Sequence, residues 1–135
     1  MLLDTCAAIW VGNQDRIAPA ALQAIRAAAA RVELLVSPVT GWEIGLATTR
    51  RGNPLILLPT PQAWLADLLA RPGVRLTPLE PQVALSASYL PGLLHGDPAD
   101  RLLIATARDL GVPLVTRDRR ILDYAAQGHV EAIAC

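Results

Sequence analysis

The stretch from His95 to Ala107 constrains what this chain can fold into more than any other. Asp97 can accept hydrogen bonds from the free N–H groups of a helix, and Pro98 suits the first helical position, where its missing N–H costs nothing. Residues 102–107 are almost wholly apolar, which predicts that this helix is buried. We therefore expect a buried central helix that carries two acids, Asp97 and Asp100, at its start.

The size and content of the chain favour one small intracellular domain. Its 135 residues suffice for a single core. No apolar run reaches the ~18 residues needed to cross a bilayer, and Met1–Asp4 meets an acid too early for a signal peptide. Cys6 and Cys135 give neither metal spacing nor a disulfide framework. We expect a reduced, cytoplasmic protein.

The charge is balanced, with 12 basic and 12 acidic residues, so no global field points to a nucleic-acid partner. All the basic residues are arginine, which excludes mechanisms that need a catalytic lysine. Hydrophobic residues make up 53% of the chain, a high share for so small a domain. Part of that apolar surface is therefore expected to meet another chain, as a homodimer, with a protein partner, or both.

Strand-type and helix-type segments alternate along the chain. The expected strands are Met1–Asp4, Val32–Val36, Val74–Leu79, Leu114–Thr116 and Val130–Ala134. The expected helices are Thr5–Val11, Pro19–Arg31, one from Pro38 to about Arg50, Pro61–Arg71, Pro81–Leu90, the central helix, and Arg117–Ala126. Such alternation forms right-handed crossovers and a covered parallel sheet. We predict an α/β fold, a three-layer α/β/α domain with four or five short parallel strands.

Four acids fall at or near the carboxyl ends of these strands. Asp4 ends the first strand, and Asp118 follows the fourth within two residues. Glu43 lies in the helix after the second strand, and Asp100 in the first turn of the central helix. Open parallel sheets place their functional sites at this edge. The four carboxyl groups are therefore expected to share one cleft.

Glu43 is the most informative of the four acids. None of the residues three or four positions away on its helix is charged, so its carboxylate is expected to be largely buried with no nearby cation. Crowded carboxylates raise one another's pKa unless a cation lies among them. Oxygen ligands without nearby His or Cys favour Mg²⁺ or Mn²⁺ over zinc. The sequence therefore predicts a divalent-ion site.

Each acid taken alone also has a purely structural explanation. Asp4 would cap the first helix, and Asp118 would be a turn residue. Glu43 would pair with a distant arginine, and Asp100 would only complement the helix dipole. Asp97 has the same alternative as a simple cap. That all of these explanations hold together is less expected than that any one of them holds alone. His95 and His129 are expected to be incidental rather than catalytic.

Four segments in order along the whole chain carry a family resemblance. They are Leu2–Thr5, Trp42–Ile44, Asp97–Ala105 and Leu114–Asp118. Together they resemble the PIN-domain ribonucleases, and more closely the VapC-type toxins of bacterial toxin–antitoxin pairs. The chain departs from the family pattern at Ala99, where an aromatic residue is usual, and in lacking the lysine that follows the Trp-Glu-Ile segment.

The resemblance implies an acidic quartet that binds Mg²⁺ or Mn²⁺ and catalyses hydrolysis of RNA phosphodiester bonds. Its members would be Asp4, Glu43, Asp100 and Asp118. Asp97 is a companion of the quartet, and Thr5 and Thr116 are expected to orient its carboxylates or a water. The resemblance also implies a cognate antitoxin, which would lay an apolar segment in a surface groove.

An acidic pocket repels RNA, so basic side chains must surround it. The candidate phosphate contacts are Arg50, Arg51, Arg101, Arg117, Arg119 and Arg120. Solvated surface arginines are the alternative explanation for each. Aromatic residues make up only 4% of the chain, so few base-stacking platforms are available.

Three other functions fit the sequence less well. A phosphatase with an aspartyl nucleophile at Asp4 would carry a second acid at position 6, which is Cys6, and a late lysine, which is absent. A receiver domain would need a similar acidic pair and lysine. A non-catalytic PIN-like interaction module is disfavoured because all four acids are present.

Overall fold

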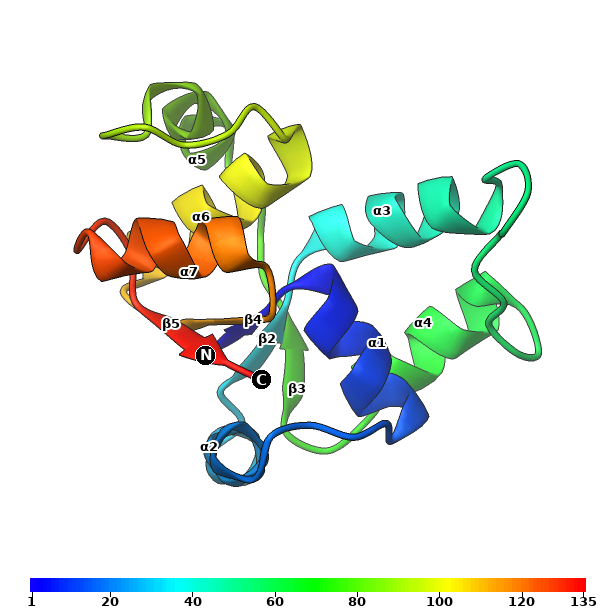
Figure 1. The fold of residues 1–135 in the computed structure, drawn as a ribbon. Coiled ribbons are helices and arrows are strands. Elements are labelled where there is room, and N and C mark those ends of the chain that lie inside the picture. The colour runs from blue at the N-terminus through cyan, green and yellow to red at the C-terminus, as the bar shows by residue number, and fades with distance from the viewer.

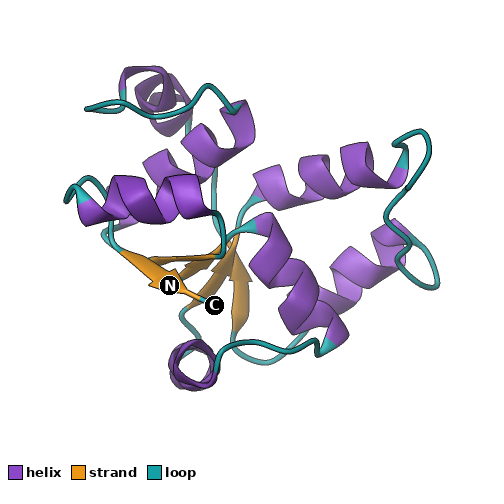
Figure 2. Cartoon of the chain, in the orientation of Figure 1, coloured by secondary structure: helices purple, strands orange, loops and turns teal.

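A parallel sheet of five strands forms the centre of the computed structural model, which describes residues 1–135. The strands are β1 (Leu2–Leu3), β2 (Leu34–Val36), β3 (Val74–Leu76), β4 (Leu114–Thr116) and β5 (Ala132–Ala134). Their order across the sheet is β3-β2-β1-β4-β5, and every neighbouring pair is parallel. Figures 1 and 2 show helices on both sides of the sheet, which confirms the predicted α/β fold with five strands.

Seven α-helices and one short 3-10 helix connect and cover the strands. They are α1 (Thr5–Asn13), α2 (Pro19–Ala30), α3 (Pro38–Thr48), α4 (Pro61–Leu69), α5 (Pro81–Ser86), η1 (Ala87–Tyr89), α6 (Pro98–Leu110) and α7 (Arg119–Ala126). No helix is long and apolar enough to cross a membrane.

Some element boundaries differ from those expected from the sequence. The strand expected to reach Leu79 ends at Leu76, and the helix expected over Pro81–Leu90 divides into α5 and η1. The last helix begins at Arg119 rather than Arg117, because the Asp118 side chain caps it. These differences lie at element ends, where local signals compete.

Adjacent residues of the central strands face opposite cores, as the two-residue period of a strand requires. Leu3 and Val115 pack in the core formed with α1, α2 and α4. Leu2 and Leu114 pack in the core formed with α6 and α7. The sheet is therefore buried on both faces, and its functional groups must lie at its edges or at the strand ends.

The central helix α6 is buried as predicted. Asp97 accepts the Ala99 and Asp100 N–H groups as its cap, and Pro98 occupies the first turn. Leu103 faces the sheet-side core, while α5 and η1 cover the other flank of α6. The start of α6 is thereby held beside the carboxyl ends of the strands.

The chain leaves β1 and β4, which are neighbours, towards opposite faces of the sheet. After β1 it enters α1 on one face, and after β4 it enters α7 on the other. In Figure 1 the starts of α1, α3 and α7 approach one another at the centre of the view. Such a divergence opens a crevice at the strand ends, which is where open α/β sheets bind ligands.

Candidate active site

Asp4 lies at the floor of this crevice. Its backbone N–H continues the β1–β4 ladder by donating to the Val115 carbonyl, at 3.0 Å. Its Oδ1 accepts the Ala7 N–H at 2.6 Å and so caps α1, and the residue is only 7% exposed. Burial raises the pKa of Asp4, and the negative charge of Asp118 raises it further. Asp4 therefore caps α1, and its ionised form is disfavoured because the carboxyl group is buried.

Glu43 lies in the second turn of α3, where it is half-buried rather than largely buried as expected. Its neighbours Trp42, Gly45 and Leu46 are exposed because this side of α3 has no helix packed over it. The Thr5 hydroxyl donates to Glu43 Oε2 at 2.5 Å. Burial raises the pKa of Glu43, and the charges of Asp97 and Asp4 raise it further.

Asp100, in the first turn of α6, has the most perturbed carboxyl group of the four. Its side chain is 17% exposed. Burial raises its pKa to about 7, with contributions in the same direction from the negative charges of Asp97, Asp118 and Glu43. Groups shifted in this way by specific neighbours within a cleft are candidates for a functional site.

Asp118 is the N-cap of α7 and the outermost of the four acids. Its N–H donates to the Thr116 hydroxyl at 2.9 Å, and its Oδ1 accepts the Arg120 N–H at 2.7 Å. Unlike the other three, Asp118 has a lowered pKa, chiefly because the Arg120 side chain hydrogen-bonds to it. Asp118 therefore remains ionised beside its three neighbours.

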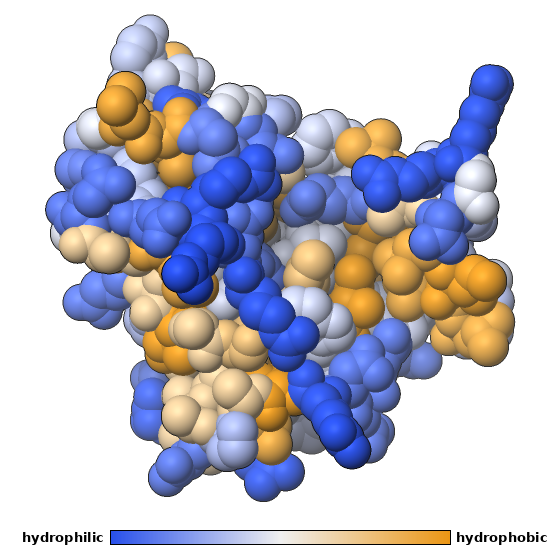
Figure 3. Space-filling model, in the orientation of Figure 1, coloured by the Kyte–Doolittle hydropathy of each residue, from blue (hydrophilic) through white to orange (hydrophobic).

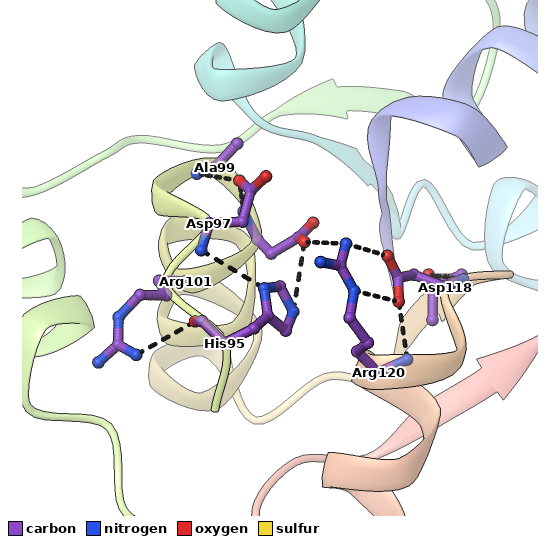
Figure 4. A network of polar contacts seen from close by, with 8 residues as sticks. His95, Asp97, Ala99, Arg101, Asp118 and Arg120 are labelled. Atoms are coloured by element: carbon purple, nitrogen blue, oxygen red, sulfur yellow. Dashed lines mark hydrogen bonds and ion pairs between the residues drawn. The ribbon is translucent and has the colours of Figure 1, made fainter. Parts of the chain in front are cut away.

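Arg120 bridges two of the acids, as Figure 4 shows. Its Nη2 lies 2.8 Å from Asp118 Oδ2 and 3.7 Å from Asp100 Oδ2, and its Nε lies 3.2 Å from Asp118 Oδ1. The guanidinium supplies the positive charge that two facing carboxylates require. No three His, Cys, Asp or Glu side chains are arranged here to hold one metal ion. Arg120 therefore supplies a positive charge to both Asp118 and Asp100.

The structure brings the four predicted acids into electrostatic contact. The negative charge of Asp118 raises the pKa of Asp4, and the charges of Asp118 and Glu43 raise the pKa of Asp100. The model of the PIN domain family matches residues 1–127 of the chain. The chain belongs to the PIN-domain family. The resemblance seen in the sequence is thereby confirmed.

Comparisons with individual proteins agree with this family. The chain is 40% identical over 127 residues to Ribonuclease VapC22 of Mycobacterium tuberculosis, covering 92% of this chain and 91% of the relative. The fold is similar to a crystal structure of VapBC2 from Rickettsia felis bound to a DNA fragment from their promoter (TM-score 0.65, 13% identity, 98% and 96% coverage). It is also similar to FitAcB from Neisseria gonorrhoeae (TM-score 0.64, 21% identity, 98% and 95% coverage).

His95, which is expected from the sequence to be incidental, lies beside the acids of this PIN-domain site. Its Nε2 lies 3.4 Å from Asp100 Oδ2, and its Nδ1 accepts the Asp97 N–H in a long hydrogen bond of 3.4 Å. A neutral His95 with this acceptor carries its proton on Nε2, facing Asp100. The Tyr124 hydroxyl donates to the Pro91 carbonyl at 2.6 Å and ties the segment before His95 to α7.

The six candidate arginines of the PIN domain have different surroundings. Arg101 donates to the Ala87 and Ser88 carbonyls, and Arg117 donates to the Cys135 carbonyl and stacks on Trp10. These contacts give both arginines a structural role. Arg120 pairs with the acids, and Arg119 is exposed next to Asp123. Arg50 and Arg51, just beyond the end of α3, are exposed and form no ion pair.

Proposed function

We propose that this PIN domain is a metal-dependent endoribonuclease and the toxin of a toxin–antitoxin pair. The observation that carries the proposal is the convergence of Asp4, Glu43, Asp100 and Asp118 at the strand ends. RNA as the substrate is supported by the 40% identity to a relative named Ribonuclease VapC22.

The donor set fits a hard divalent ion such as Mg²⁺ or Mn²⁺, because it consists of carboxyl oxygens whose charges repel in the ion's absence. Asp4, Glu43, Asp100 and Asp118 would hold the ion after Arg120 leaves Asp118 and Asp100, since the carboxyl groups are not yet arranged around one ion. When bound, it would lower the pKa of a water and neutralise charge that develops on the phosphoryl group. Thr5 fixes the direction of Glu43, and Thr116 holds the backbone that carries Asp118.

Cleavage of total cellular RNA, mapped with and without Mn²⁺, tests this proposal. We expect discrete cleavage sites in Mn²⁺ or Mg²⁺ and none in EDTA, because the carboxylates alone cannot activate water at neutral pH. Denatured protein carried through the same purification controls for contaminating nucleases. Cleavage that persists unchanged in EDTA would reject the metal-dependent mechanism.

A non-catalytic PIN-like interaction module is the second candidate. The ion pairs of Arg120 favour it, because they neutralise two of the four acids without any metal. The nuclease requires a divalent ion to replace Arg120 at Asp118 and Asp100, whereas the interaction module does not.

The variant Arg120→Ala is expected to bind Mn²⁺ about threefold to tenfold more tightly than the wild type. The ion would no longer displace a guanidinium from Asp118 and Asp100. Isothermal titration calorimetry at pH 8 measures this affinity. Arg119→Ala removes the same charge one position away, where its side chain pairs only with Asp123, and is the control. Equal affinities for both variants would show that Arg120 does not compete with the metal.

The proposed antitoxin would have an apolar surface available. Hydrophobic residues gather at the α3–α4 end of the molecule in Figure 3, and exposed Leu46, Ile56 and Leu58 belong to this region. Two similar structures come from systems named VapBC2 and FitAcB. A small neighbouring gene product is expected to co-purify with this chain. Consistent recovery of the protein alone, or as a homodimer only, would count against the toxin role.

A further inference from the structure

A cleft of about 500 Å³ lies between α3 and the start of α6. We call it the Trp42 cleft, because Trp42 lines it together with Leu46, Ala47 and Arg50 of the α3 side. Glu43 and Asp97 line it as well. Since Glu43 belongs to the acidic site as well, the cleft adjoins that site.

Trp42 is the one aromatic side chain next to the acids that presents a free face. It is 49% exposed, although an indole of this size is usually covered. Trp10 is covered by the Arg117 guanidinium at 3.9 Å, and Trp64 and Tyr124 are buried. Tyr89 is exposed but lines a separate hollow beside α5 and η1. Next to the acids, a flat π-surface is thus available only at the Trp42 cleft.

Arg50 is the only basic residue that lines the Trp42 cleft, and it forms no ion pair. It lies two residues beyond the end of α3, and Trp42, Leu46 and Ala47 line the cleft beside it. Because Arg50 forms no ion pair with Glu43 or Asp97, its guanidinium is free to bind a phosphate in the cleft.

We propose that the Trp42 cleft binds a nucleotide of single-stranded RNA adjacent to the cleaved bond, with its base on Trp42 and its phosphate at Arg50. An aromatic face recognises any base by stacking, and a guanidinium recognises a phosphate. The cleft combines both beside the acids that the proposed reaction uses, whereas a purely apolar protein segment would leave Arg50 without a partner. The inference rests on the proposed function and adds to it a subsite for one nucleotide, formed by Trp42 and Arg50 beside the acids.

Binding of a fluorescein-labelled, random-sequence, single-stranded RNA of eight nucleotides tests the inference. The measurement is made in EDTA on the full chain, so that it needs neither metal nor cleavage. We expect Trp42→Ala to raise the Kd roughly tenfold or more, and Trp42→Tyr to restore most of the affinity. Arg50→Gln is expected to raise the Kd. It is also expected to reduce the slope of log Kd against log salt concentration by about 1, which corresponds to the loss of one phosphate contact.

Tyr89→Ala and Arg26→Gln are matched controls, since both remove an exposed side chain of the same kind outside the Trp42 cleft. Neither is expected to change the Kd. Circular dichroism melting confirms that each variant is folded. No RNA binding by the wild type, or equal losses in Trp42→Ala and Tyr89→Ala, would overturn the inference.

Two further outcomes separate the proposals. If Trp42→Ala and Arg50→Gln lose only the affinity for a co-purified antitoxin, the Trp42 cleft is a protein-binding surface and the inference is wrong. If RNA binding depends on Trp42 while no RNA is cleaved in Mn²⁺, the inference holds and the proposed nuclease activity is wrong.

Discussion

Replacing Asp4 with asparagine is expected to reduce RNA cleavage by at least roughly 10³-fold while leaving the fold intact. The Asp4 Oδ1 accepts the Ala7 N–H, and an asparagine carbonyl oxygen caps a helix equally well. The substitution therefore removes the charge that would hold the divalent ion and preserves the hydrogen bond that starts α1. Single-turnover cleavage in Mg²⁺, together with thermal melting, measures the two effects separately.

Thr60→Asn is the matched control for this experiment. Thr60 caps α4 by accepting the Ala63 N–H, and it lies outside the site. Asparagine at this cap is expected to change neither the cleavage rate nor the melting temperature by much. An Asp4→Asn protein that keeps more than about a tenth of the wild-type rate would contradict the role of Asp4 as a ligand.

In the absence of metal, the protein is expected to be more stable at pH 5 than at pH 8, and Asp100→Asn is expected to remove most of this difference. The pKa of Asp100 is about 7 in the folded chain against an ordinary value of 3.8. Between these values the folded state binds more protons than the unfolded state, so the free energy of unfolding falls as pH rises. Above pH 7 the Asp100 carboxyl group is ionised in both states, and its destabilising effect is constant.

The other acids modify this dependence in known directions. The raised pKa values of Asp4 and Glu43 add to the loss of stability with rising pH, whereas the lowered pKa of Asp118 opposes it. Asp100→Asn should therefore raise the melting temperature at pH 8 by several degrees. In a chain of this size, each kcal/mol gained in the free energy of unfolding raises the melting temperature by about 3–6 °C. Melting curves from pH 4 to 8 measure the effect.

Asp109→Asn, at the exposed end of the same helix, is the control for Asp100→Asn and is expected to leave the pH profile unchanged. Mn²⁺ should restore stability to the wild type at pH 8 and much less at pH 5, because ligand carboxyls must be deprotonated. A wild-type profile that is flat between pH 5 and 8 would show that Asp100 is not held in an unfavourable environment.

The fold was predictable because its signals are local. The Asp97–Pro98 pair indicates the start of α6. Asp4 and Asp118 are expected at strand ends because they follow β1 and β4 closely in the sequence. Parallel pairing then brings strand ends together whatever the loops do. The carboxyl groups of Asp4 and Asp118 accordingly lie near one another, as expected.

The less predictable features depend on tertiary packing. Glu43 was expected to be largely buried because its helical neighbours are uncharged, but no element covers the Trp42 side of α3. Arg120 lies two residues from Asp118, yet its contact with Asp100 depends on where α6 is placed. The proximity of His95 to Asp100 likewise follows from the path of the loop before α6.

The hydrogen bond between the Tyr124 hydroxyl and the Pro91 carbonyl has a mechanical consequence. The buried Tyr124 ring belongs to α7, the helix that Asp118 starts, while Pro91 precedes the loop that leads to His95 and α6. Displacement of α7 by a bound macromolecule would therefore pull on that loop. The hydrogen bond thereby links α7 to the loop before α6, so that movement of Asp118 with α7 would be transmitted towards His95 and Asp100.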